Sequence, residues 1–121
     1  MAIPSGSGTE VLKRATRNAL NNSTFTIGAV ASGADVNIGT NHIVTIISIF
    51  IHNTSGTATF WRMDLNDGSN DIRMYGNTDL APNTTFVWND KFILTSGDKL
   101  KLTTGSQDFD IVITYIDQDW T

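Results

Sequence analysis

Turn-forming clusters recur along this chain at short spacing, among them NTSG at 53–56, NDGSND at 66–71 and TSGD at 95–98. The runs between them are short and rich in Val, Ile, Thr and aromatic residues, a composition that favours β-strands. We therefore predict strands throughout the chain. They lie near residues 24–30, 42–52, 57–65, 70–75, 84–88, 90–95, 98–104 and 109–117.

This pattern restricts the fold class. No helical pattern recurs between the predicted strands, which argues against a parallel α/β sheet. Many short strands joined by tight turns are typical of antiparallel sandwiches and barrels. A chain of 121 residues is long enough for one buried core and too short for a second. We expect one all-β domain, an antiparallel β-sandwich of jelly-roll-like or Ig-like type, with an N-terminal arm.

Two predicted strands are apolar on both sides, unlike 98–104, where Leu100 and Leu102 alternate with lysines. Strict alternation over 43–51 places Ile43, Thr45, Ile47, Ile49 and Ile51 on one face, opposite Val44, Ile46, Ser48 and Phe50. In 109–116, Val112 and Ile116 oppose Phe109, Ile111, Ile113 and Tyr115. A sandwich covers only one face of each sheet, so the second face needs an arm, a loop or another subunit. We predict core or interface positions at Ile47, Ile49, Phe50, Ile111 and Ile113.

The first 20 residues differ from the rest in composition. Ser7 and Glu10 match a capping box, and Val11, Leu12, Ala15 and Ala19 fit one helical stripe, which favours a short helix. Two glycines near the start and Asn18 oppose it. We divide the chain into an arm, 1–20, whose conformation stays open, and a sandwich domain, 21–121. The arm either reaches a neighbouring subunit or packs on its own domain.

Charge is unevenly distributed between these two parts. Residues 1–20 hold three cations and one glutamate, a balance of +2, so the total of −4 leaves −6 for residues 21–121. An acidic body without a basic patch argues against direct nucleic-acid binding.

The longest apolar run is too short to span a membrane, and no secretory signal is expected at the N-terminus. Because the chain contains no cysteine, it has no disulfide framework.

Residues that could carry chemistry are scarce. A regular strand would separate His42 from His52 by roughly 33 Å, too far to share a ligand. The cluster from Asp64 to Asp71 fails as a calcium loop, because its sixth and twelfth positions are Ser69 and Tyr75 rather than Gly and Glu. A hairpin turn around Asp67-Gly68 is the simpler interpretation. We predict a non-enzymatic protein without catalytic, metal-binding or cofactor-binding residues.

The aromatic residues support an alternative function. A sugar-binding module on a β-sandwich can present aromatic side chains as a platform, and five residues are candidates for one. They are Trp61, Tyr75, Phe86, Trp88 and Trp120.

The segments MAIPSGSGTEVLKR, HIVTIISIFIHNTSGTA and LAPNTTFVWNDKFILTSGDKLKLTT, with DIVITYID near the end, resemble small virion structural proteins of tailed bacteriophages. The resemblance covers most of the chain and implies a particle component, in capsid decoration, tail or neck adaptor, or fibre. It transfers no active-site residues. The implied location is the virion, assembled in the host cytoplasm, and the implied partners are major capsid or tail proteins.

Both lines of argument predict a chain built for assembly. Closed rings, trimers or hexamers, would cover the outer apolar faces. The residues predicted to mediate assembly come from the arm and from the doubly apolar strand. They are Val11, Leu12, Arg14, Arg17, Leu20, Ile49 and Phe50.

Overall fold

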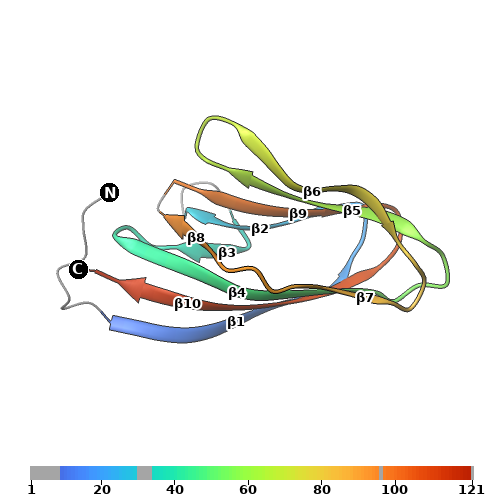
Figure 1. Cartoon of the computed structure of the whole chain (residues 1–121), viewed down its shortest axis with the longest axis horizontal. Coiled ribbons are helices and arrows are strands. Elements are labelled where there is room, and N and C mark those ends of the chain that lie inside the picture. The colour runs from blue at the N-terminus through green and yellow to red at the C-terminus, as the bar shows by residue number, and fades with distance from the viewer. Residues whose placement is uncertain (1–8, 30–33, 96, 121) are drawn as a thin grey trace.

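The computed structural model describes residues 9–29, 34–95 and 97–120, which form two β-sheets packed face to face (Figure 1). Sheet A contains, in spatial order, β1 (Thr9–Leu20), β10 (Phe109–Asp119), β4 (His42–Asn53), and then β7 (Thr85–Trp88) with β8 (Phe92–Thr95). Sheet B contains β3 (Val36–Ile38), β2 (Thr24–Ala29), β9 (Lys99–Thr104), β5 (Thr59–Asn66) and β6 (Asp71–Leu80). The predicted all-β sandwich is confirmed.

The strand order is that of a jelly roll. β7 and β8 pair with different halves of β4, so together they form one interrupted edge strand. β3 adds three parallel residues to the edge of β2. Without β3, the orders β1-β10-β4-β7/β8 and β2-β9-β5-β6 give two four-stranded antiparallel sheets between which the chain repeatedly crosses.

Every strand predicted from the sequence is present, and the ends differ by up to five residues. The predictions missed β3 and β1. The short helix favoured for the arm is wrong over residues 9–20, because β1 is extended and pairs antiparallel with β10 from Thr9 to Leu20. This part of the arm therefore packs on its own domain. The capping residue Ser7 lies outside the described residues.

A bulge in β4 corrects the predicted face assignment. Thr114 pairs with Ser48, whereas Tyr115 pairs with Ile46, so Ile47 is an extra residue in β4. One extra residue reverses the alternation beyond it. Ile49 and Ile51 therefore face the core together with Val44 and Ile46, and Phe50 faces outward. This arrangement also places His42 and His52 on opposite faces of the sheet.

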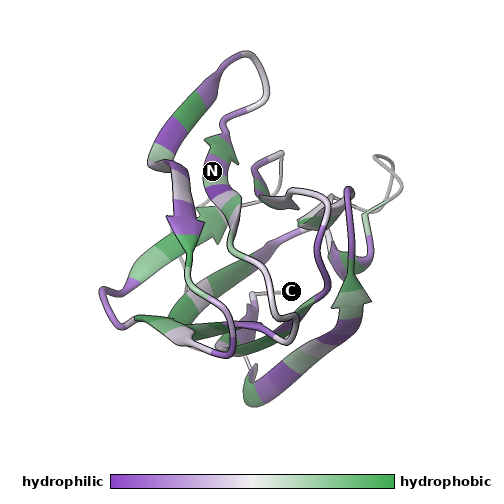
Figure 2. Ribbon diagram, turned by 90° about the vertical axis from the view of Figure 1, so that its right-hand side faces the viewer, coloured by the Kyte–Doolittle hydropathy of each residue, from purple (hydrophilic) through white to green (hydrophobic). Residues whose placement is uncertain are grey.

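The core lies between the sheets. Viewed along the strands, apolar and polar segments alternate within them (Figure 2). β10 follows the predicted alternation, with Phe109, Ile111, Ile113 and Tyr115 buried. The largest fully buried side chains are Trp61, Phe109, Leu20, Ile27, Ile38, Ile46, Ile49, Ile51, Met63, Leu94, Leu100 and Leu102.

The NTSG turn is held by a buried asparagine. The side-chain amide of Asn53 donates to the carbonyls of Thr57 and Leu80, and its oxygen accepts from the backbone N–H and hydroxyl of Ser55. The side-chain amide of Asn53 therefore has hydrogen-bond partners although it is fully buried.

Within the described ranges, no helix is long and apolar enough to cross a membrane.

Candidate assembly surface

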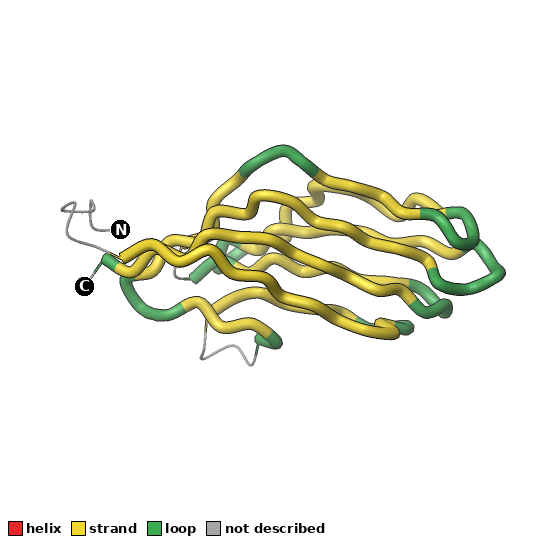
Figure 3. Tube along the Cα trace, turned by 90° about the horizontal axis from the view of Figure 1, so that it is seen from below, coloured by secondary structure: helices red, strands yellow, loops and turns green. Residues whose placement is uncertain are grey.

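The outer face of sheet A is an apolar surface built from rows of paired residues. Figure 3, seen from below, looks toward this sheet. One row runs Thr16, Val112, Phe50, Val87, and another runs Leu12, Ile116, Thr45, Ile93. Directly paired residues share a face of the sheet. We call these two rows, with the Arg14, Thr114, Ser48 row between them, the apolar face.

Several side chains of the apolar face are exposed to solvent. Leu12 is 69% exposed, Ile93 52%, Phe50 45% and Val87 43%. Among the described residues six large hydrophobic side chains are exposed, and these four lie on the apolar face. Scattered exposed hydrophobic residues are ordinary, but a contiguous group marks an interaction site.

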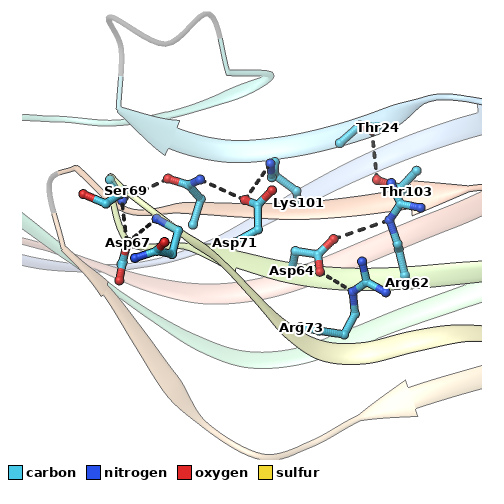
Figure 4. A network of polar contacts seen from close by, with 12 residues as sticks. Thr24, Arg62, Asp64, Asp67, Ser69, Asp71, Arg73, Lys101 and Thr103 are labelled. Carbon is cyan, nitrogen blue, oxygen red and sulfur yellow. Dashed lines mark hydrogen bonds and ion pairs between the residues drawn. The ribbon is translucent and has the colours of Figure 1, made fainter.

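Sheet B presents a polar outer face (Figure 4). Its rows run Thr24, Thr103, Arg62 and then Thr26, Lys101, Asp64, Arg73. Asp64 is buried and accepts a hydrogen bond from the Arg73 guanidinium, and Arg62 Nε lies 3.4 Å from its other carboxylate oxygen as an ion pair. Lys101 Nζ lies 2.8 Å from Asp71, and the hydroxyls of Thr24 and Thr103 are 2.9 Å apart. This face pairs its polar groups with one another.

An ionic cluster on the inner side of sheet A connects β1 to β10 and β4. Asp117 of β10 accepts a hydrogen bond from Lys13 Nζ at 2.8 Å, and its other oxygen lies 2.6 Å from His42 Nδ1. Burial would raise the pKa of Asp117, but these two contacts outweigh it and hold the pKa below its ordinary value. The hydrogen bond to Asp117 raises the pKa of Lys13. The cluster thus links β1, β10 and β4 through charge.

The other arm residues predicted for assembly fall into two groups. Arg14 lies in the middle row of the apolar face, whereas Arg17 and Val11 point to the opposite side of β1, where Arg17 lies 3.9 Å from Asp35. Leu20 is fully buried in the core. Ile49 of β4 is also fully buried, so these two residues leave the set of surface candidates. Of the five that remain, Leu12, Arg14 and Phe50 lie on the apolar face, and the exposed Val11 and Arg17 lie on the other side of β1.

The residues tested for chemistry have structural partners. Asp67 accepts from the backbone N–H groups of Ser69 and Asn70, which lowers its pKa, and Gly68 has φ of +101°. The predicted hairpin turn is therefore confirmed. His52 Nδ1 lies 2.7 Å from the Thr85 hydroxyl. Among the described residues no group of three His, Asp or Glu side chains is placed to hold a metal ion.

The aromatic residues do not form one exposed platform. Trp61 is fully buried, its ring stacks on Tyr75 at 4.6 Å between centroids, and Phe86 lies 5.1 Å from it. This cluster fills the space between β5, β6 and β7. Trp88 donates its indole N–H to the Asp90 carbonyl and meets Phe92 edge-on, and the Trp120 backbone N–H bonds to Asn41. The alternative of a sugar platform therefore has no common surface.

Sequence reasoning missed four of the six large apolar residues of the apolar face. Val112 and Ile116 were visible as the second side of a doubly apolar strand, but they were not assigned to assembly. Val87 and Ile93 lie in TFVW and FILT, which are also apolar at successive positions. That signal is too short to separate the two faces without knowledge of which strand they pair with.

The fold and this surface define a jelly-roll sandwich with one uncovered apolar face. No protein-family model matches the chain, and no curated protein matches it. A solved subunit of Bacillus endospore appendages, which form disulfide-linked pili, is 13% identical with a TM-score of 0.55, covering 100% of this chain and 97% of that one. The Drosophila NLP-core is 15% identical, with a TM-score of 0.47 and coverage of 89% and 95%. A chain of infectious bursal disease virus, Gx strain, is 9% identical, with a TM-score of 0.45, covering 97% of this chain and 29% of that one. At these identities, the likeness concerns the fold alone.

Proposed function

We propose that this chain is a non-enzymatic structural subunit of an assembled particle or appendage. The observation that carries the proposal is the uncovered apolar face of sheet A, beside a sheet B whose outer face is internally paired. Covering the apolar face with a neighbour removes apolar surface from water, which stabilises an assembly. The same fold in an endospore appendage subunit supports this coarser role. These 121 residues contain no cysteine, so they form no disulfide bonds to neighbours.

At the finer level we propose a bacteriophage virion component, in capsid decoration or associated with the tail. The support is the resemblance of the segments at 1–14, 42–58 and 80–117 to small virion proteins. The proposed location is the virion, and the partners are major capsid or tail proteins. A trimeric or hexameric arrangement remains part of this proposal. The arm contributes Leu12 and Arg14 to the contact surface.

The test is the presence and copy number of the chain in purified particles. Quantitative mass spectrometry and antibody labelling should find it as a stoichiometric component at a fixed position. Particles produced with Phe50→Asp should lack it, whereas Ile72→Asp should leave incorporation unchanged. Ile72 is the matched control because it is 48% exposed and lies on β6, away from the apolar face. A chain absent from purified particles would contradict the virion role.

A further inference from the structure

We infer that the apolar face packs against the same face of a second copy of this chain, around a two-fold axis parallel to the strands. This inference rests on the proposed structural role and names the partner of its surface. Four observations support it. The edge strands are short or irregular, the apolar face is large enough for an interface, its apolar residues face each other in the pair, and two opposite charges come together.

The edges of the sandwich disfavour strand addition. β1 carries Lys13 and Arg17 on its inner side and has a register shift between Arg17 and Leu20. β6 pairs with two register shifts, β3 has three residues, and β7 and β8 have four residues each. Inward charges, irregular pairing and short strands are the devices that prevent edge-to-edge pairing. Assembly through a face is therefore the better supported alternative.

The area is sufficient for a pair of copies. Strands about 4.8 Å apart and residues spaced about 3.3 Å along them give a four-stranded face of roughly 500 Å² between Ile43 and His52. Two such faces together bury roughly 1,000 Å², the level that a specific interface requires. A smaller ligand would leave much of the face in water.

A two-fold axis that runs between β10 and β4, parallel to the strands, places each row of one copy opposite the same row of the second copy. The axis reverses each row, so Leu12 meets Ile93 of the second copy and Val112 meets Phe50 of the second copy. Val112 and Phe50 thereby form apolar contacts near the axis, Leu12 and Ile93 form them on the outer strands, and Ile116 meets Thr45. Packed sheets cross at about −30° and lie about 10 Å apart, so this match holds best at the centre.

Two charges fix the direction of the axis. Arg14 lies at one end of the middle row, which runs through Thr114 to Ser48. Beyond Ser48 the row reaches the 89–91 connection between β7 and β8, which contains Asp90. Neither the Arg14 nor the Asp90 side chain forms an ion pair within the described chain. The proposed axis brings Arg14 toward Asp90 of the second copy, whereas an axis across the strands would place Arg14 against Arg14.

The first experiment measures the mass of the purified chain by light scattering and sedimentation. The unmodified chain should form pairs, or larger assemblies with an even number of copies such as a hexamer, and a trimer would contradict the inference. Phe50→Asp should raise the dissociation constant about tenfold or more, whereas Ile72→Asp should leave it unchanged. Circular dichroism checks that both variants fold. A chain that is monomeric at its highest soluble concentration, or a Phe50→Asp variant whose dissociation constant is unchanged, overturns the inference.

A charge exchange tests the axis itself. Arg14→Glu and Asp90→Arg should each weaken pairing, and the double variant should restore it because the two charges have exchanged places. Failure of the double variant to recover overturns the two-fold arrangement. The result is separate from the virion test. A chain that pairs but is absent from particles contradicts only the proposed function, and one that is present in particles but does not pair contradicts only this inference.

Discussion

The outer faces of the two sheets contain the same number of main strands, yet they meet water differently. On sheet B, Asp64, Arg73, Lys101 and Asp71 pair with neighbours on the same face (Figure 4). On sheet A, Leu12, Phe50, Val87 and Ile93 have no covering element among the described residues. The outer face of sheet B pairs charged side chains within one chain, whereas the outer face of sheet A leaves large apolar side chains exposed to water.

The comparison also shows where burial and exposure meet in one strand. Ile49 and Phe50 are neighbours in β4, but Ile49 is fully buried and Phe50 is 45% exposed. The inner face of sheet A stabilises the fold and the outer face is available for assembly. Substitutions can therefore separate the two roles.

Deleting residues 2–20 should have the largest effect. The deletion removes Leu12 and Arg14 from the apolar face and leaves the face of sheet B intact. We expect a folded domain that no longer assembles, with unfolding free energy lower by about 2–5 kcal/mol because Leu20 leaves the core. Circular dichroism and sedimentation measure the two effects. Deletion of residues 2–8 is the control because it retains β1, and an unfolded 2–20 truncation would mean that β1 is required for folding.

Replacing neighbouring residues of β4 should separate stability from assembly. Ile49→Ala should cost about 2–5 kcal/mol, because it leaves a cavity in the core. Phe50→Ala should change the stability of the monomer by less than about 1 kcal/mol, because much of the ring already contacts water, yet it should weaken assembly. Urea titration of dilute protein gives the stabilities, and light scattering gives the assembly. Equal costs for the two substitutions would show that the bulge at Ile47 is misplaced.

The smallest effect is expected on the polar face. The hydrogen bond from Lys101 lowers the pKa of Asp71, and the Asn66 amide adds to it. Because the folded pKa lies below the unfolded value of 3.8, the stabilisation is present above that pH and is lost as pH falls through the folded pKa. Asp71→Asn should lower the urea midpoint slightly at pH 7 and leave it unchanged in strong acid. Asp79→Asn, on the same strand, is the control, and a pH-independent difference for Asp71→Asn would contradict this origin.

Much of the fold was predictable from local patterns. Turn clusters and β-rich runs gave the positions of eight strands, and alternation gave the buried side of β9 and β10 correctly. β1 was missed because its side chains are mostly exposed, with only Ala15 and Leu20 buried, so it carries no amphipathic period. β3 was missed because three residues give no pattern. The faces of β4 were misassigned beyond Ile46, because a bulge is a property of strand pairing.

For the candidate site, the sequence alone identified a surplus of apolar side chains in β4 and β10 and an uneven charge distribution along the chain. It could not say which surplus residues share a surface, since Leu12, Val112, Phe50 and Val87 are far apart in sequence. Local propensity and turn chemistry act between near neighbours, and these determined the class of fold. Register, the bulge at Ile47 and the alignment of rows across four strands arise only when distant segments pair, so the tertiary structure alone decided where the apolar face lies.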